Sequence, residues 1–283
     1  MAVGRMASAS RAGVSLGLTG WGHTSDPGGV MTRGAPDEAR LAVLIDADNA
    51  RAQYLEPLLI EIAKYGRASV RRAYGDWTSN QLAPWKAELL SSSVQPIQQF
   101  SYTTGKNATD SALIIDAMDL LHTGNLDGFC LVSSDSDFTR LAARIREEGL
   151  TVYGFGERKT PKPFVSACDT FIYVENLLTP AAEAEGPDAS VLGGDAGLDR
   201  LLAEAVDSAA GDDGWANLGA VGSNLSRLAS DFDSRTWGFK KLKDLMSAHP
   251  DYVVQTHSPG EGKSPSAHVR RRRSAAVDHR RKL

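Results

Sequence analysis

The sequence has few cysteines, no long apolar run and no excess of positive charge, and each scarcity excludes a class of protein. Its two cysteines among 283 residues, Cys130 and Cys168, give neither a zinc-binding spacing nor a disulfide framework. No apolar run approaches the roughly 20 residues of a membrane-spanning helix, and the first thirty residues make a poor signal peptide. We therefore expect a cytoplasmic protein without a membrane partner, translated from Met1 or Met31.

The charge is unevenly distributed, although the formal net charge is only -4. From Lys263 to the C-terminus there are eight basic residues and one acid, Asp278, so this segment carries +7 and leaves about -11 on the remainder. Blocks of like charge are often interaction tails. The sequence therefore predicts a basic tail suited to a polyanion and an acidic body that repels one.

Composition and periodicity divide the chain into five parts. The length allows one large domain or two small ones, and 42% hydrophobic residues are enough for packed cores. We expect a disordered leader (1–38), an α/β domain (39–177), a linker (178–196), a small helical domain (197–257) and a disordered Arg-rich tail (258–283).

Strands and helices alternate along the first domain, which predicts βαβ units and a mainly parallel sheet with helices on both faces. Five apolar residues, 41–45, predict a central strand that is buried on both sides. Further strands are expected at 68–74, 94–100 (an edge strand), 129–132, 151–155 and 171–174, and helices at 52–65, 79–90, 110–122 and 138–148. In the second domain, helices at 197–210, 217–229 and 237–248 and a strand at 252–254 predict a helix-turn-helix or winged-helix module.

Acidic residues follow two of these strands at the point where each strand ends. Asp46 and Asp48 come directly after the first strand, and Asp135 and Asp137 follow the fourth. Parallel sheets form their ligand sites beyond the carboxyl ends of the strands. Together with Asp110, which opens a helix, these acids would form a group of five carboxylates whose mutual repulsion requires a cation. Oxygen ligands favour Mg²⁺ or Mn²⁺, as one ion or two.

The position of Asp110 in its helix supports a role in this group. Residues 113, 114, 117 and 121 form an apolar stripe that Asp110 extends, so its side chain is expected to face the sheet. Asp116 and Asp119 fall on the opposite side and are expected to be solvated. Two alternatives stay open: Asp110 stabilises the helix N-terminus through its dipole, and Asp137 serves as an N-cap.

Three motifs resemble the NYN domain family of PIN-like, LabA-like nucleases: I-D-A-D-N at 45–49, T-G-K-N-A-T-D at 104–110 and L-V-S-S-D-S-D-F at 131–138. The segment 213–254, with Gly214-Trp215 and Gly238-Phe239, resembles the OST-HTH or LOTUS module, a winged helix associated with RNA. The first resemblance implies a PIN-like Rossmannoid fold and metal-dependent hydrolysis of RNA phosphodiester bonds. The second implies capture of RNA by the C-terminal domain.

The NYN resemblance also implies which residues form the site. The catalytic and metal-binding residues would be Asp46, Asp110, Asp135 and Asp137, with Asp48 as a weaker ligand. Asn49 would orient a bound water or close the turn after the first strand.

Basic residues of both domains and of the tail are candidates for contacts with RNA phosphates. These are Arg71, Arg72, Lys106, Lys240, Lys241, Lys243, Arg270, Arg271, Arg272 and Arg273. The RNA is expected to be single-stranded or structured. The choice of RNA over DNA rests on the resemblance alone, and pairing of two copies of the chain into a homodimer stays open.

Two other functions also stay open. In the first, the protein is a non-catalytic RNA-binding adaptor, and substitution of Asp46 or Asp135 leaves RNA binding intact. In the second, the strand-end D-x-D belongs to a metal-dependent phosphatase that resembles haloacid dehalogenases. Against this, Asn49 follows directly where that family has D-x-D-x-Thr or Val, and no cap domain is visible.

Overall fold

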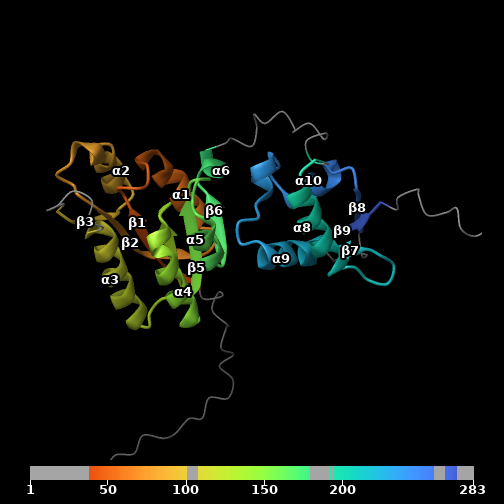
Figure 1. The fold of residues 1–283 in the computed structure, drawn as a ribbon, viewed down its shortest axis with the longest axis horizontal. Coiled ribbons are helices and arrows are strands. Elements are labelled where there is room, and N and C mark those ends of the chain that lie inside the picture. Colours follow the sequence, from red (N-terminus) through yellow and green to blue (C-terminus); the bar gives the residue numbers. More distant parts are fainter. Residues whose placement is uncertain (1–37, 101–107, 179–191, 193, 258–264, 273–283) are drawn as a thin grey trace, which may run out of the picture. The chain divides into compact units, whose positions relative to one another are not determined.

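The computed structural model describes residues 38–100, 108–178, 192, 194–257 and 265–272. Within these ranges the chain forms an N-terminal α/β domain and a C-terminal domain of helices and a small sheet (Figure 1). No helix of the described residues is long and apolar enough to cross a membrane.

The N-terminal domain is built on a six-stranded parallel sheet, which confirms the predicted α/β class. The strand order is β3-β2-β1-β4-β5-β6, so the chain builds outward from β1 to one edge and then resumes on the other side of β1. The strands span Arg40–Asp46 (β1), Arg67–Gly75 (β2), Gln95–Gln98 (β3), Gly128–Val132 (β4), Thr151–Gly156 (β5) and Thr170–Tyr173 (β6).

Strand β1 is central because its residues are apolar on both faces. Leu41, Ala42, Val43, Leu44 and Ile45 are each at most 1% exposed. Side chains alternate along a strand, so the odd-numbered residues pack into one layer and the even-numbered ones into the other. The polar strand β3 lies at the edge, as predicted.

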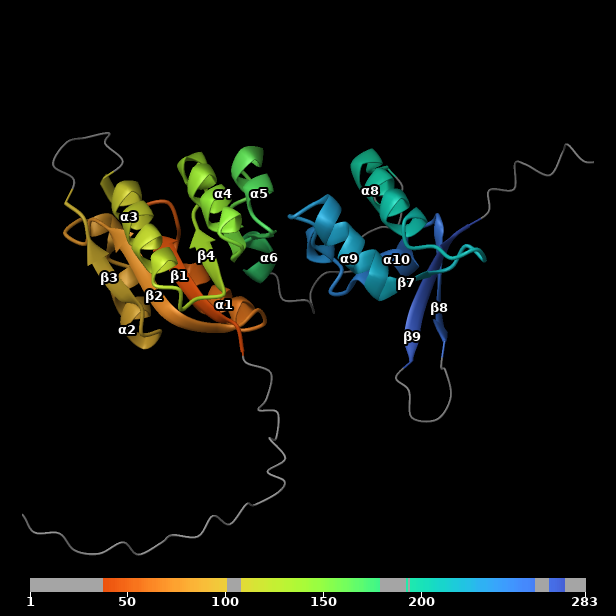
Figure 2. The same cartoon turned by 90° about the horizontal axis from the view of Figure 1, so that it is seen from below.

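Helices cover both faces of this sheet (Figure 2). One face packs against α3 (Ala108–His122), α4 (Thr139–Glu147) and α5 (Lys162–Ala167). The other packs against α1 (Leu55–Ile62) and α2 (Trp85–Ser91). A four-residue helix, α6 (Glu175–Leu178), follows β6.

Proline accounts for several differences from the predicted helices. The helix expected at 79–90 is divided into a 3-10 turn, Asn80–Leu82, and α2, and Pro84 lies between them. The helix expected at 52–65 begins as a 3-10 turn, Ala52–Tyr54, and continues as α1, whose first turn contains Pro57. Helix α5 was not predicted; Pro161 is its N-cap residue and Pro163 lies in its first turn, where proline is tolerated.

Among the described residues, the C-terminal domain packs three helices around a three-stranded antiparallel sheet with the order β7-β9-β8, which confirms the winged-helix prediction. The elements are α8 (Ala196–Asp207), β7 (Ala216–Asn217), α9 (Leu218–Leu228), α10 (Leu242–Ala248), β8 (Tyr252–His257) and β9 (Ser266–Arg271). Helix α10 starts later than expected because a 3-10 turn, Ser234–Trp237, ends at Gly238, whose φ of 83° interrupts the helix.

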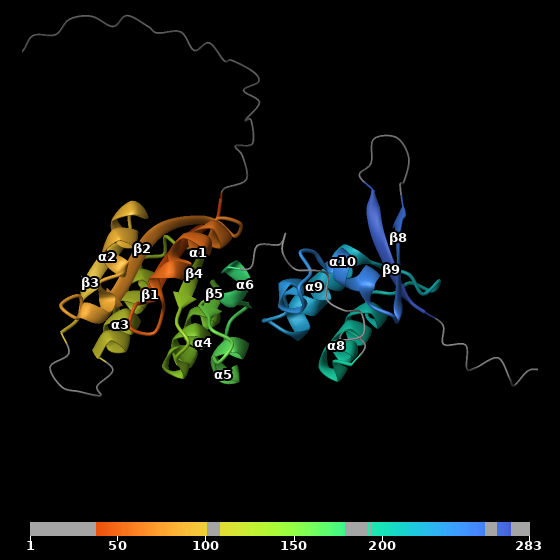
Figure 3. The same cartoon turned by 90° about the horizontal axis from the view of Figure 1, so that it is seen from above.

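Strand β9 corrects the predicted tail. The sequence predicts no structure after residue 258, but Ser266–Arg271 pairs with β8 along its whole length. Only Val269 of this strand is buried, so its apolar pattern is too weak to identify it, and pairing with β8 and β7 holds it in place. Strands β8 and β9 project beyond the helices of this domain as a wing (Figure 3).

Candidate functional site

The carboxyl ends of β1 and β4 bring the two acidic motifs together. The strands pair in parallel with Ile45 opposite Val132, so Asp46 and Ser133 leave the sheet side by side. The strand order reverses between β1 and β4. Parallel sheets leave a ligand crevice at this kind of position.

Three carboxylates from two segments converge beside this point. Asp110 lies in the first turn of α3, and Asp135 and Asp137 belong to the turn that follows β4. One carboxylate oxygen of each residue lies within 4.8 Å of those of the other two. We call these three residues the carboxylate triad. It contains three of the four residues that sequence reasoning assigns to catalysis.

Asp110 faces the sheet, where its position on the apolar stripe predicts it, and is only 8% exposed. Burial, and after it the neighbouring carboxylates of Asp46, Asp135, Asp137 and Asp48, together raise the pKa of Asp110 to about 6. No hydrogen-bond donor among the described residues offsets this effect. Among the described residues, no donor therefore offsets the negative charge of the Asp110 carboxylate.

Asp46 is fully buried, and its carboxylate is held by hydrogen bonds. Its Oδ2 accepts from Asn49 Nδ2 at 2.8 Å and from Ser133 Oγ at 2.7 Å, and its Oδ1 accepts from the Asn49 backbone N–H at 3.3 Å. Burial raises the pKa of Asp46, and these hydrogen bonds oppose the shift. Asp46 lies outside the carboxylate triad, so its role as a metal ligand stays a prediction.

Ser133 connects the two acidic motifs, and sequence reasoning gives it no role. Its hydroxyl donates to Asp46 and accepts the backbone N–H of Asp135 at 3.1 Å. The register of the sheet could have identified it, because Ser133 follows β4 by one residue and β4 is the neighbour of β1.

The N-cap after β4 is Asp135 and not Asp137, so the predicted capping role of Asp137 is wrong. Asp135 Oδ1 accepts the backbone N–H of Asp137 at 2.9 Å. The cap lies earlier than expected because a 3-10 turn, Ser136–Phe138, precedes α4.

The exposed turn after β1 contains Asp48 and Asn49. Thr109 Oγ1 donates to Asp48 Oδ2 at 2.8 Å, which ties this turn to the first turn of α3. Asn49 closes the turn onto Asp46. The predicted roles of Asp48 as a ligand and of Asn49 in orienting a water stay predictions.

Two predicted RNA-binding residues of the N-terminal domain have partners within it. Arg71 Nη1 donates to the carbonyl of Ser92 at 3.0 Å, and Arg72 forms an ion pair of 2.5 Å with Asp116. Asp116, which the sequence predicts to be solvated, is instead half-buried between Arg72 and the hydroxyl of Tyr74. The helical wheel wrongly predicts a solvated Asp116 because α3 packs against β2 as well as β1.

Of the predicted lysines of the C-terminal domain, Lys243 has a partner within it, because its Nζ donates to Thr256 Oγ1 at 3.2 Å. Lys240, Lys241 and Lys243 are exposed around the start of α10. Two further candidates, Lys106 and Arg273, lie outside the described residues.

The arginines expected in the tail belong to the wing and its end. Arg270 places its guanidinium over the ring of Trp215, 4.7 Å from the ring centre. Arg271 Nη1 lies 3.5 Å from a carboxylate oxygen of Asp207, and Arg272 Nε donates to a backbone carbonyl of β8. RNA binding by all three stays a prediction.

Comparisons with known proteins identify both domains. The NYN domain family model matches residues 40–177, and the OST-HTH/LOTUS domain model matches residues 195–264. The crystal structure of a protein of unknown function from Vibrio parahaemolyticus is 18% identical, with a TM-score of 0.42, over 48% of this chain and 93% of that one. The solution structure of an uncharacterized protein from Nitrosomonas europaea is 34% identical, with a TM-score of 0.27, over 36% of this chain and 92% of that one. No curated protein matches the sequence. The chain thus contains an NYN domain followed by an OST-HTH/LOTUS domain.

Proposed function

We propose that the chain is a metal-dependent endoribonuclease that hydrolyses RNA phosphodiester bonds at the carboxylate triad. NYN domains are typically metal-dependent nucleases, and LOTUS domains bind RNA. The observation that carries the proposal is the convergence of carboxylate oxygens from Asp110, Asp135 and Asp137 within 4.8 Å of one another.

The triad suits Mg²⁺ or Mn²⁺. Carboxylates are the oxygen ligands that these ions prefer, and two ligands on opposite sides of one Mg²⁺ lie about 4 Å apart. The raised pKa of Asp110, about 6, indicates a negative field that a cation would relieve.

A bound divalent cation would neutralise charge on the phosphate and lower the pKa of a water molecule. The chain's own residues prepare the place for it. The triad supplies the ligands, while Asn49 and Ser133 fix the buried carboxylate of Asp46 and so hold the ends of β1 and β4 together. A rigid frame of this kind keeps the reacting groups in position.

The C-terminal domain would retain the RNA through its phosphates. Lys240, Lys241 and Lys243 are exposed, and Arg270 with Trp215 offers a cation beside an aromatic ring. Phosphate contacts of this kind give affinity without sequence preference. RNA as opposed to DNA, a cytoplasmic location and a homodimer stay predictions, and no comparison supports the homodimer.

The test is a cleavage assay on end-labelled single-stranded and hairpin RNA with Mn²⁺, Mg²⁺ or EDTA. We expect cutting with metal only, and its loss in Asp135→Asn, which removes a charge but keeps an N-cap side chain. The control is Asp119→Asn, an exposed position on α3 that should cut as the wild type does. Cutting in EDTA, or equal activity of the two variants, would refute the proposal.

The same assay separates the two alternatives. RNA binding without cleavage under any metal condition would favour the adaptor. A phosphatase of the haloacid-dehalogenase kind needs an aspartate nucleophile, but Asp46 is 0% exposed and its Oδ2 already accepts two hydrogen bonds. This geometry opposes attack on a phosphorus atom.

A further inference from the structure

A hydrogen bond from Thr109 to Asp48 joins two segments that lie 61 residues apart in the chain. Thr109 Oγ1 donates to Asp48 Oδ2 at 2.8 Å. Thr109 is buried and directly precedes Asp110 in the first turn of α3, whereas Asp48 lies in the exposed turn after β1. The bond therefore connects this turn to the residue next to one member of the carboxylate triad.

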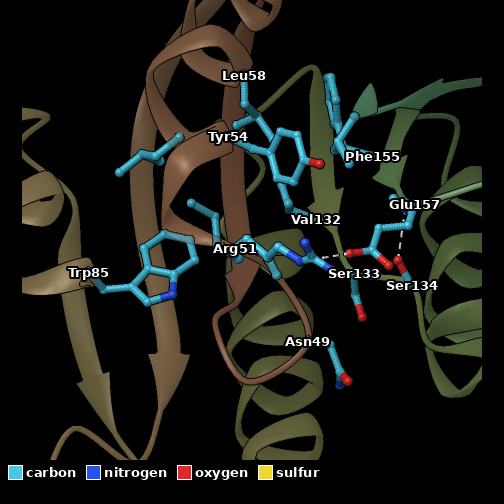
Figure 4. A pocket seen from close by; sticks show the side chains of 15 residues that line it. Asn49, Arg51, Tyr54, Leu58, Trp85, Val132, Ser133, Ser134, Phe155 and Glu157 are labelled. Atoms are coloured by element: carbon cyan, nitrogen blue, oxygen red, sulfur yellow. Dashed lines mark hydrogen bonds and ion pairs between the residues drawn. The ribbon is translucent and has the colours of Figure 1, made fainter. Parts of the chain in front are cut away.

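The turn after β1 is itself held against the sheet. The backbone N–H of Ala47 donates to the carbonyl of Tyr74 at 2.9 Å, and the backbone N–H of Ala50 donates to the carbonyl of Asp46 at 2.9 Å. The pocket beside Asn49, which this turn lines, measures only about 20 Å³, so closely packed side chains lie behind the turn (Figure 4). The turn thus offers α3 a fixed point of attachment.

The end of β2 leaves room for the side chain of Asp48. Gly75 has no side chain, and a Cβ atom at this position would lie 3.3 Å from Asp48 Oδ1 and 2.5 Å from Leu82 Cδ1. The Asp48 carboxylate therefore lies close to the end of β2 and accepts the Thr109 hydroxyl through its other oxygen. These two neighbours confine the carboxylate, although Asp48 is an exposed residue.

The position of the Asp110 carboxylate depends on the first turn of α3. Among the described residues, no donor holds this carboxylate directly. The ion pair of Arg72 with Asp116 also attaches α3 to β2, but it lies six residues farther along the helix, which is about 9 Å. Asp48, which is not a member of the carboxylate triad, is thus the attachment nearest to Asp110.

We propose that Asp48 is a positioning residue, which acts through Thr109 to hold Asp110 in place for the metal and does not bind the metal itself. The inference rests on the proposed function and gives a different role to a residue that the sequence predicts as a weaker ligand. Removal of a group that orients a metal ligand typically weakens metal binding by roughly 10- to 100-fold. We expect the lower end of this range, because the attachment at Asp116 remains.

The first test measures Mn²⁺ binding to the full-length protein by calorimetry, without RNA. Thr109→Val removes the hydroxyl but keeps the shape and charge of the side chain, and it should raise the dissociation constant roughly tenfold. Thr109→Ser keeps a hydroxyl and should bind as the wild type does. The matched control is Thr123→Val, which removes a hydroxyl that donates to the carbonyl of Leu120 at 2.7 Å, at the other end of α3. Equal affinities of Thr109→Val and Thr123→Val would overturn the inference.

The second test distinguishes a positioning residue from a ligand. Asp48→Asn and Asp48→Ala lose the same charge, but only asparagine keeps an oxygen that accepts the Thr109 hydroxyl. Asp48→Asn should therefore bind Mn²⁺ several-fold more tightly than Asp48→Ala. Because both residues act through one hydrogen bond, adding Thr109→Val to Asp48→Ala should cause no further loss. A further loss as large as that of Thr109→Val alone, or equal affinities of the two Asp48 variants, would overturn the inference.

The two proposals fail separately. If the wild type cuts RNA with metal but Thr109→Val binds Mn²⁺ as the wild type does, the nuclease stands and the positioning role is wrong. If the variants show the expected affinities and no metal supports cutting, the positioning role stands and the nuclease is wrong. A wild type that binds no Mn²⁺ would overturn both.

Discussion

Replacement of Asp110 by Asn should stabilise the metal-free protein while removing its response to metal. The pKa of Asp110 is raised from 3.8 to about 6 by burial and by its acidic neighbours. At about 1.4 kcal/mol per unit, the ionised carboxylate lowers the free energy of unfolding by about 3 kcal/mol at pH 8. Asn removes this destabilisation. It also removes a negative charge that stabilises the N-terminus of α3 by up to about 1 kcal/mol. The net gain should be about 2 kcal/mol.

The dependence on pH follows from the direction of the shift. Between pH 3.8 and about 6 the folded protein binds more protons at Asp110 than the unfolded chain does, so stability falls as the pH rises through this window. Below it the carboxyl is neutral in both states and imposes no penalty. The advantage of Asp110→Asn should therefore be small near pH 4.5 and complete by pH 7 to 8.

The assay is urea and thermal unfolding of the wild type, Asp110→Asn and the exposed control Asp119→Asn, in EDTA and in Mn²⁺. In EDTA at pH 8, Asp110→Asn should melt higher by roughly 4 to 8 °C, and the control should match the wild type. Saturating Mn²⁺ at 100 times its dissociation constant would stabilise the wild type by about 2.7 kcal/mol and cancel the difference. An advantage that is absent at pH 8, or that does not change with pH, would refute the reasoning.

Two further substitutions test hydrogen bonds to the buried carboxylate of Asp46 and the half-buried carboxylate of Asp116. Ser133→Ala removes the donor to Asp46, and urea titration should show a loss of about 1.5–3 kcal/mol; the exposed control Ser136→Ala should change stability by less than about 0.5 kcal/mol. Tyr74→Phe keeps the ring but removes the hydroxyl that donates to Asp116, and the urea midpoint should fall by an amount equivalent to about 1–2 kcal/mol. An unchanged midpoint in either variant would contradict the assigned bond.

The sequence predicts the sheet and the place of the acids because both depend on local patterns. A strand that is buried on both sides must be apolar throughout, and residues 41–45 are. Parallel strands present their ends at one edge, so the D-x-D motifs after β1 and β4 meet once these strands are neighbours. The inward face of Asp110 follows from the helical stripe in the same way.

Contacts between distant segments could not be predicted from such patterns. The ion pair of Arg72 with Asp116 joins residues 44 positions apart, and it turns a predicted RNA contact and a predicted solvated acid into partners. Strand β9 has one buried residue, Val269, and exists because β8 and β7 offer it backbone hydrogen bonds. In each case the tertiary partner, and not the local sequence, determines the outcome.

The carboxylates of Asp46 and Asp110 differ in their hydrogen bonds, and this difference indicates different roles. Asp46 is the most buried acid, and its charge is supported by Asn49 and Ser133 within the protein. Asp110 is nearly as buried, but the described residues offer it no donor. A buried charge without a partner is unfavourable unless something outside the chain supplies one. We infer that Asp46 organises the ends of β1 and β4, whereas Asp110, which has no donor among the described residues, is the carboxylate whose charge a cation would offset.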